Sequence, residues 1–234
     1  MMEISFIVPT LNEVKNVPLV LDLIAQSTTL TETTYEVIFV DDKSTDGTID
    51  LILSLSSTDP RIRLIISPER KGLGHALKLG IAAGKMKLVL LLDCDVSIQK
   101  EDLIKLLKNA TPEKMLIGSR YIKGGQTIGA PAVKVFISKC LNWAISRYLK
   151  IPAVDISHSL RVFSPQNLAM PKNNTHPAFF WELSIKGQHH GLNVCELPIT
   201  FRERRHGQSK NVTRKMIKSV LQGFRTIAAL KSKN

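Results

Sequence analysis

The 234-residue sequence has few cysteines, few aromatic residues and no long apolar run. Its three cysteines are widely spaced and odd in number, which fits neither a disulfide framework nor a paired-cysteine zinc site and favours a reducing cytosol. No stretch reaches the roughly 18 consecutive apolar residues that a membrane-spanning helix needs. The first residues also lack the charged leader of a secretory signal. We therefore expect a cytoplasmic protein that does not cross a membrane by itself.

Positive charge, in contrast, is abundant: 32 Lys and Arg against 20 Asp and Glu give a formal net charge of +12. Ten of the basic residues and only one acid lie in residues 202–234. This balance indicates an anionic partner such as a nucleotide, a phospholipid or a nucleic acid. An aromatic content of 6% offers no obvious stacking platform for a nucleic acid. A basic carboxyl-terminal end can be a solvated helix face or a membrane contact, and the charge alone leaves both open.

Short apolar runs alternate with segments of helical period through the first half of the chain. The runs ISFIV, YEVIFV, RLII, KLVLLL and MLIG have the length and the branched residues of buried strands. This alternation predicts an α/β fold whose mostly parallel sheet is covered on both faces by helices. The second half predicts an amphipathic helix over residues 133–149, a strand at LRVF, a helix through FFWELSIKGQHHG, a strand at NVCELPITF and a final amphipathic helix.

Polar or acidic clusters follow three of the predicted strands. They are Pro9-Thr10-Leu11-Asn12-Glu13, Asp41-Asp42-Lys43-Ser44 and Asp93-Cys94-Asp95. Ligands of open parallel sheets bind at the carboxyl ends of the strands, so the three clusters should converge on one site. Taken singly, each can be an ordinary turn or helix cap. Together they favour a nucleotide site, where one of Asp41 and Asp42 bonds a nucleobase and the other holds the ribose or the loop.

Asp93 and Asp95 are separated by one residue, so both carboxylates can face a shared ion. Their hard oxygens suit Mg²⁺ or Mn²⁺, which usually completes its shell with phosphate oxygens and water. Two other segments favour phosphate. The glycines of RKGLGHA, at a helix start, permit a close approach by an anion, and the cations of RERRHGQSK can clamp a diphosphate leaving group. A generic basic loop is the alternative for the second segment.

Six motifs, in the same order along the chain, resemble those of glycosyltransferase family 2, particularly its dolichyl-phosphate mannose synthase and polyprenyl-phosphate glycosyltransferase branch. The motifs are IVPTLNE, VDDKSTDGT, RKGLGHA, DCDVS, GSRYIKGG and LPITFRERRHGQSK. The resemblance covers nearly the whole chain. It implies a GT-A (Rossmann-like) fold, a nucleoside diphosphate sugar donor, Mg²⁺ or Mn²⁺, and inversion at the anomeric carbon. We expect one domain, with a nucleotide-sugar-binding half at 1–118, an acceptor and late donor-loop half at 119–211, and a basic amphipathic helix at 212–234.

The resemblance also implies roles for individual residues. Asp95 and Arg120 are the expected catalytic residues, and Asp93 and Asp95 are the expected metal ligands. An acceptor phosphate is expected at Arg120, Lys134 and Ser138. The expected donor-binding residues are Pro9, Thr10, Glu13, Asp41, Asp42, Gly74, Asp93, Arg204, Ser209 and Lys210.

Two departures from the family pattern bear on the acceptor. Residues 155–161 read DISHSLR, without the glycine and the aromatic residue that the family usually has, and Lys134 stands where arginine is common. Lysine keeps the charge but not the bidentate fork.

The expected activity is transfer of a hexose, from a donor of the GDP-mannose or UDP-glucose type, to a polyprenyl or dolichyl phosphate at the cytoplasmic face of a membrane. Peripheral binding to an anionic membrane or an anchoring subunit would hold the chain there. One alternative is transfer to a sugar hydroxyl in cell-surface polysaccharide synthesis, with Asp155 as the base. The alternative of another class is a noncatalytic protein that binds a nucleotide sugar or a nucleic acid; the acidic motifs disfavour nucleic acid, because they would repel its phosphates.

Overall fold

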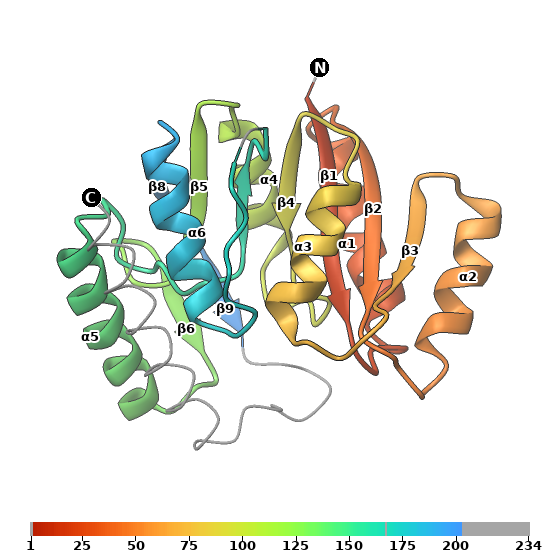
Figure 1. The fold of residues 1–234 in the computed structure, drawn as a ribbon, viewed down its shortest axis with the longest axis horizontal. Coiled ribbons are helices and arrows are strands. Elements are labelled where there is room, and N and C mark those ends of the chain that lie inside the picture. Colours follow the sequence, from red (N-terminus) through yellow and green to blue (C-terminus); the bar gives the residue numbers. More distant parts are fainter. Residues whose placement is uncertain (1, 167, 203–234) are drawn as a thin grey trace.

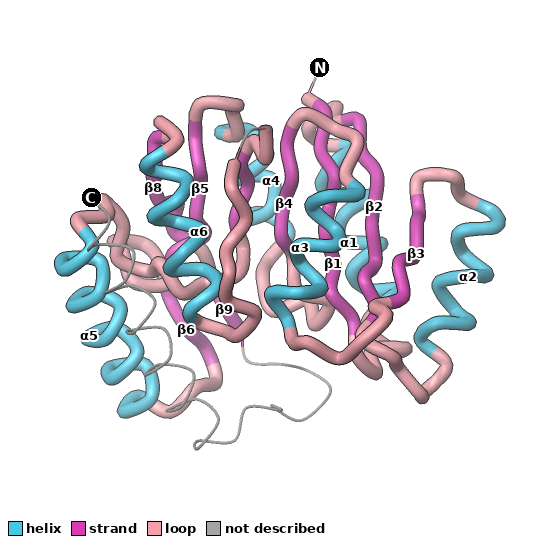
Figure 2. Tube along the Cα trace, in the orientation of Figure 1, coloured by secondary structure: helices cyan, strands magenta, loops and turns pink. Residues whose placement is uncertain are grey.

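The computed structural model describes residues 2–166 and 168–202. Its main sheet has seven strands in the order β3-β2-β1-β4-β7-β5-β8. Neighbouring strands pair in parallel except at β7, which is antiparallel to both β4 and β5. This confirms the predicted α/β class with a mostly parallel sheet (Figures 1 and 2). The strands are β1 (Glu3–Thr10), β2 (Thr34–Asp41), β3 (Ile62–Ile66), β4 (Leu88–Leu91), β5 (Lys114–Ser119), β7 (Arg161–Phe163) and β8 (Asn193–Pro198).

Helices cover both faces of this sheet, as the alternating pattern predicted. In Figure 1, α3 and α6 lie in front of the sheet and α1 lies behind it, while α2 and α5 stand at opposite ends of the molecule. The carboxyl ends of β1, β2 and β4 face the edge of the sheet opposite the amino terminus. The helices of the described residues are α1 (Val17–Thr29), α2 (Thr48–Thr58), α3 (Leu73–Ala83), α4 (Lys100–Asn109), α5 (Ala132–Leu149) and α6 (Ala178–His189).

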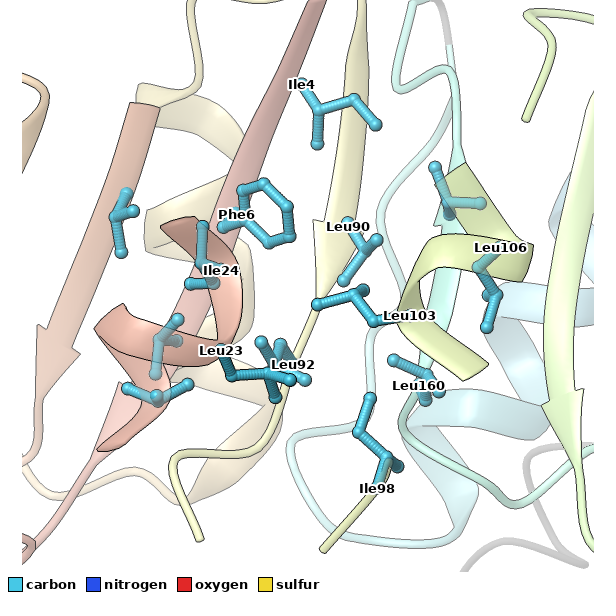
Figure 3. Packing of buried hydrophobic residues seen from close by; sticks show 14 of the residues in the cluster. Ile4, Phe6, Leu23, Ile24, Leu90, Leu92, Ile98, Leu103, Leu106 and Leu160 are labelled. Atoms are coloured by element: carbon cyan, nitrogen blue, oxygen red, sulfur yellow. The ribbon is translucent and has the colours of Figure 1, made fainter. Parts of the chain in front are cut away.

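The core consists of two hydrophobic clusters, one on each face of the sheet. Alternate residues of one strand enter different clusters, because successive side chains of a strand point to opposite faces. Phe6 and Leu90 pack with α1 and α4, whereas Ile7 and Leu91 pack with α3 and α6. Figure 3 shows the first cluster, in which Leu160 from the second half of the chain lies near Ile98 and Leu106. Both halves of the described chain therefore share one core.

A small second sheet extends the molecule beyond the main one. The predicted strand NVCELPITF forms two strands, β8 and then β9 (Thr200–Arg202), separated at Ile199. Strand β9 pairs in parallel with β6 (Gln126–Ile128), which the sequence pattern did not indicate. The expected boundaries at 1–118, 119–211 and 212–234 stay predictions, and the expected final helix lies outside the described residues.

Helix α5 exposes large apolar side chains and buries polar ones beside Ile145. Its inward positions include the buried polar residues Asn142 and Ser146. Much of its predicted apolar face points away from the domain. Phe136, which belongs to that face, is 67% exposed. Trp143, which the sequence pattern did not assign to that face, is 58% exposed. Among the helices in residues 2–166 and 168–202, none is long and apolar enough to cross a membrane.

Candidate active site

The central strands separate at their carboxyl ends. Pairing of β1 with β2 continues to Thr10 and Asp41, but pairing of β1 with β4 ends at Ile7 and Leu91. Pro9 follows, and it has no backbone N–H to donate to a neighbouring strand. Strand β1 is also the switch point of the sheet, since the chain continues to β2 on one side of it and later to β4 on the other. Ligands of such sheets bind at this place.

Asp41 anchors the loop that follows β2. Its buried carboxylate accepts hydrogen bonds from Thr10 Oγ1 at 2.9 Å, from Ser44 N at 2.7 Å and from Ser44 Oγ at 2.6 Å. The neighbouring Asp42 is less buried, and its N–H donates to the carbonyl of Thr10. Arg70 supports the same loop by donating from Nε to the Asp42 carbonyl at 3.0 Å. Of the two carboxylates, Asp41 is therefore the one that holds the loop.

The loops after β1, β2 and β4 each contain a non-glycine residue with positive φ. These are Asn12 at 57°, Lys43 at 65° and Val96 at 50°. Asparagine tolerates this conformation, but a β-branched valine is strained there. Strained backbone of this kind concentrates at functional sites, so the three loops support a ligand site at this edge.

Three carboxylates gather around the end of β4. Burial raises the pKa of the Cys94 thiol well above its usual value, and the negative charges of Glu13, Asp95 and Asp93 raise it further. Glu13 is oriented by Asn16, whose Nδ2 donates to Glu13 Oε2 at 2.6 Å. The negative charges that disfavour a thiolate at Cys94 also favour a cation near this position. The Cys94 side chain itself packs inward as part of the core.

The residue types around Asp93 and Asp95 fit a divalent cation that takes its remaining ligands from a substrate. Within residues 2–166 and 168–202, no three His, Cys, Asp or Glu side chains are arranged as a complete metal site. Mg²⁺ in particular is usually held by one or two carboxylates together with substrate phosphates and water. An open cleft of about 490 Å³ borders Asp95. Its walls include Asn16, Leu19, Asp22, Leu23, Gln26, Val96, Ile98, Gln99, Lys100, Glu101 and Arg202.

Gly74 lies in the first turn of α3, where close packing requires a glycine. A Cβ atom there would be 2.6 Å from Cδ2 of Phe179 and 2.8 Å from the Cα of Asn174. The N–H of Gly74 donates to the Asn174 carbonyl at 2.9 Å. The structure thus gives Gly74 a packing role, and its expected contact with the donor stays a prediction.

On the other side of the site, Arg120 forms a bidentate ion pair with Asp155. Nε and Nη2 of Arg120 donate to the two carboxylate oxygens at 2.8 and 2.7 Å. The N–H of Asp155 is bound in turn by the carboxylate of Glu196 at 2.7 Å. Burial lowers the pKa of Arg120, but the bonds and charge of Asp155, together with the charge of Asp93, raise it overall. The pair is therefore electrostatically linked to the carboxylate of Asp93, which follows β4.

The other expected acceptor residues lie at the start of α5. Ser138 is hydrogen-bonded by the hydroxyl of Tyr121 at 2.8 Å, and the Arg120 guanidinium lies 4.8 Å from the centre of the Tyr121 ring. Tyr121 thus connects Arg120 to Ser138. Lys134 precedes Ser138 by four residues, a spacing that places both on one side of the helix. The Lys134 side chain is exposed.

Several residues of this region were missed in the sequence. Tyr121 could have been found because it follows Arg120 directly. Ser159 donates its hydroxyl to Asp93 Oδ2 at 2.5 Å, and no periodicity indicates that contact across 66 residues. His158 packs edge-on against Phe201, and burial together with the Arg120 charge lowers its pKa to about 3, so its imidazole is neutral. The expected donor residues Arg204, Ser209 and Lys210 lie outside the described residues.

An α/β sheet with carboxylates at its switch point is the architecture of GT-A glycosyltransferases, and sequence comparison specifies the family. Glycosyl transferase family 2 matches residues 5–168. The chain belongs to this family, which confirms the resemblance seen in its motifs.

Two characterised relatives match most of the length of the chain. The chain is 29% identical over 224 residues to the undecaprenyl-phosphate mannosyltransferase of Micrococcus luteus, covering 89% of this chain and 87% of that protein. It is also 29% identical over 232 residues to the polyprenol monophosphomannose synthase of Mycolicibacterium smegmatis, covering 94% and 86%.

Solved structures confirm the fold. Glucosyl-3-phosphoglycerate synthase from Mycobacterium tuberculosis, in complex with Mn²⁺, UDP and glucosyl-3-phosphoglycerate, aligns with a TM-score of 0.70 and 18% identity. The alignment covers 97% of this chain and 79% of that one. The complex of the same enzyme with phosphoglyceric acid aligns with a TM-score of 0.69 and 19% identity over the same shares.

Proposed function

We propose that this chain transfers a hexose, with inversion, from a nucleoside diphosphate sugar to a polyprenyl or dolichyl phosphate at a membrane surface. An acceptor phosphate oxygen attacks the anomeric carbon from the face opposite the leaving group. The new C–O bond forms as the bond to the nucleoside diphosphate breaks, and the diphosphate leaves with the electron pair. Two relatives of matching length, both named for transfer of mannose to polyprenyl phosphates, support this choice of acceptor.

The donor side of the proposed site uses the carboxyl ends of β1, β2 and β4. Asp41 is fully buried and holds the loop after β2 through three hydrogen bonds, so the less buried Asp42 is proposed to offer its carboxylate to a nucleobase or ribose donor. Contacts with the donor are also proposed for Pro9, Thr10 and Glu13. Contacts with the donor phosphates are proposed for Arg204, Ser209 and Lys210.

Asp93 and Asp95 are proposed to hold Mg²⁺ or Mn²⁺ against the donor diphosphate. A divalent cation there supplies positive charge that stabilises the departing diphosphate. Mn²⁺ is present with UDP in a fold neighbour, which supports this class of ion. Asp95 is proposed to contribute most to catalysis, because it is the more buried of the two and its charge bears on the leaving group.

The observation that carries the acceptor proposal is the buried pair of Arg120 and Asp155. A phosphate acceptor needs cations and no base, whereas a sugar hydroxyl must lose a proton as it attacks. Burial raises the pKa of Asp155, but the bonds and charge of Arg120 hold it below its usual range. A carboxylate stabilised in this way is a weak base, which disfavours the hydroxyl alternative. Nη1 of Arg120 is not part of the pair, and with Lys134 and Ser138 it is proposed to bind the acceptor phosphate.

Location at a membrane is proposed from α5. Its sequence contains Lys134, Lys139 and Arg147 and no acid, and large apolar side chains point away from the domain. Apolar insertion and attraction to anionic lipid reinforce each other on such a surface. A membrane-anchoring subunit would serve the same end, and the chain is proposed to work at the cytoplasmic face.

The proposal is tested by comparing acceptors. Purified protein is given GDP-mannose or UDP-glucose with polyprenyl phosphate, with the matching free polyprenol and with oligosaccharides, and release of nucleoside diphosphate is followed. Turnover that requires the lipid phosphate is expected, and Arg120→Ala should impair use of the acceptor more than binding of the donor. Transfer to a sugar hydroxyl with none to the lipid phosphate would instead support Asp155 as a base. Binding of a nucleotide sugar with no transfer to any acceptor would support the noncatalytic alternative.

A further inference from the structure

One short segment, residues 155–161, is bonded to both sides of the candidate site. Asp155 at its start pairs with Arg120 on the expected acceptor side. Ser159, four residues later, donates to Asp93 on the expected donor side. The segment therefore joins two places whose separation has to be maintained if a nucleophile and a leaving group are to be aligned.

Bonds to the backbone hold this segment in place. Arg161 is wholly buried, and its Nη2 donates to the carbonyl oxygens of Ile156 at 3.2 Å and His158 at 2.6 Å. The N–H of Ser157 donates to Oδ1 of the buried Asn142 of α5 at 2.9 Å. Nη1 of Arg161 also donates to the Phe180 carbonyl at 3.3 Å and to Ser184 Oγ at 3.1 Å, so bonds to α5 and α6 both hold the segment.

Apolar side chains fix the segment on both faces of the sheet. Ile156 is fully buried in the cluster with α3 and α6, whereas Leu160 is buried in the cluster with α1 and α4 (Figure 3). The carbonyl of Leu160 accepts a hydrogen bond from Gly118 of β5 at 2.9 Å. The Ser159 hydroxyl is thus presented to Asp93 by a rigid frame rather than by a free loop.

The contact between Ser159 and Asp93 is of a strong kind. A hydroxyl that donates to an ionised carboxylate forms a short, charge-assisted bond, and 2.5 Å lies at the short end of that range. The bond fixes one oxygen of Asp93 and so limits rotation of the carboxylate. Groups that orient a metal-binding carboxylate in this way contribute to metal affinity although they do not touch the ion.

We propose that Ser159 is a positioning residue, which orients the Asp93 carboxylate for the divalent cation and the donor diphosphate. The inference rests on the proposed function, since it gives Asp93 the role of a ligand. It adds that residues 155–161 set donor and acceptor geometry together, with Ser159 acting on one side and Asp155 on the other.

The experiment measures binding of Mn²⁺ by titration calorimetry in the presence of UDP and, separately, of GDP. Ser159→Ala is compared with Ser159→Thr, which keeps a hydroxyl, and with Ser157→Ala, which removes a hydroxyl from the same segment while keeping the backbone bonds of that residue. Thermal unfolding of each variant checks that the fold is retained.

We expect Ser159→Ala to weaken Mn²⁺ binding by roughly tenfold to a hundredfold, the usual effect of losing a group that orients a metal ligand. Ser159→Thr should restore most of the affinity, and Ser157→Ala should match the unchanged protein. In the transfer assay, Ser159→Ala should need more Mn²⁺ for half-maximal rate, with much of the rate regained at saturation. A purely structural defect would not be rescued by added metal.

The inference is overturned if Ser159→Ala binds Mn²⁺ as tightly as the unchanged protein does. It is also overturned if Ser159→Ala and Ser159→Thr lose Mn²⁺ affinity to the same extent. The binding measurement needs no acceptor, so it is independent of the acceptor proposal. If no transfer to polyprenyl phosphate occurs but Ser159→Ala still weakens Mn²⁺ binding, the acceptor proposal fails and the inference stands. Absence of Mn²⁺ binding to the unchanged protein with either nucleotide overturns both the metal assignment and the inference.

Discussion

Arg120 and Asp155 form a two-point ion pair in which the carboxylate is completely buried and the arginine side chain is 16% exposed. The guanidinium donates through Nε and Nη2, and the N–H of Arg120 adds a third bond to Asp155 at 2.9 Å. Breaking such a pair by removing one partner is costly, because the other charge stays buried without compensation.

Asp155→Asn is therefore expected to lower the free energy of unfolding by about 3–5 kcal/mol at neutral pH. A matched control is Asp59→Asn, which removes the carboxylate from the bidentate but exposed pair with Arg61 and should cost less than about 1 kcal/mol. Urea unfolding of both variants and of the unchanged protein measures the difference. Equal losses in the two variants would contradict a special role for burial.

The same pair gives the unchanged protein a particular dependence on acid. The pKa of Asp155 is lowered in the folded state, so its stabilising effect is present above the ordinary aspartate pKa of about 3.9 and is lost as the pH falls through the lower folded value. In urea unfolding between pH 7 and pH 3, the unchanged protein should lose stability below about pH 4 more steeply than Asp155→Asn. Parallel curves would show that Asp155 does not contribute.

Asp95→Asn should reduce turnover by about a hundredfold or more while the protein stays folded, because loss of the charge weakens the site for the cation that stabilises the diphosphate. Asp22→Asn is the control, since Asp22 borders the same cleft as Asp95 but is placed on α1. A chelator should likewise remove activity, and Mn²⁺ or Mg²⁺ should restore it. Turnover that survives both the Asp95 substitution and the chelator would refute the metal assignment.

Gly74→Ala tests close packing between α3 and the segment before α6. The added methyl group meets the backbone of Asn174, which is less able to move aside than the end of a side chain. We therefore expect the free energy of unfolding to fall by about 1–3 kcal/mol. At Gly187, a Cβ atom would meet the end of the flexible Met115 side chain at 2.6 Å. Gly187→Ala should therefore cost less. Thermal unfolding of the two helical variants, side by side, decides whether the backbone contact matters.

Most strands of the first half could be predicted because they are buried on both faces, so that a run such as VIFV in β2 is apolar throughout. Strand polarity alone predicted that Asp41 and Asp93 belong to strand ends at the same edge of the sheet, and β2 and β4 do run parallel to β1. The sequence did not reveal β6 or β9, since three-residue strands carry no measurable period. It also gave no sign that β7 runs antiparallel between β4 and β5.

Side-chain partners were harder to predict than strands. Arg120 and Asp155 are 35 residues apart, and Asp93 and Ser159 are 66 apart. Both contacts depend on the insertion of β7 between β4 and β5, which brings residues 155–161 beside the ends of those strands. A local pattern does not reveal such contacts, so the sequence offered Asp155 only as the base of the sugar-hydroxyl alternative and not as the partner of an arginine.

The direction of the α5 apolar face was also open in the sequence, because helical spacing shows that a face exists but not what covers it. In the structure Phe136 and Trp143 point outward, while Ser138, Asn142 and Ser146 lie on the inward side. Hydrogen bonds from other segments occupy that inward side: the Tyr121 hydroxyl donates to Ser138, and the N–H of Ser157 donates to Asn142. Rotating the helix to bury its apolar face would break these bonds, so this orientation is fixed by the domain itself.

The last prediction follows from that orientation. The protein should float with liposomes that contain anionic lipid and should be released as salt is raised, because each Lys or Arg near such a surface contributes about 1 kcal/mol and ions screen the attraction. Replacing both Phe136 and Trp143 by Ser should reduce flotation by about tenfold or more, because burial of a large apolar side chain contributes about 1.5–3 kcal/mol.

Leu53→Ser is the matched control for this surface. Leu53 is also half-exposed and apolar, but it lies on α2 at the opposite end of the molecule (Figure 1). Its substitution should leave flotation unchanged if α5 is the contact. Equal effects of the two substitutions would point to nonspecific adhesion, and no flotation at any lipid composition would leave an anchoring subunit as the means of reaching the lipid. An acceptor with a long isoprenoid tail has its phosphate at the membrane surface, so binding through α5 would place Ser138 and Lys134 of the same helix beside that phosphate.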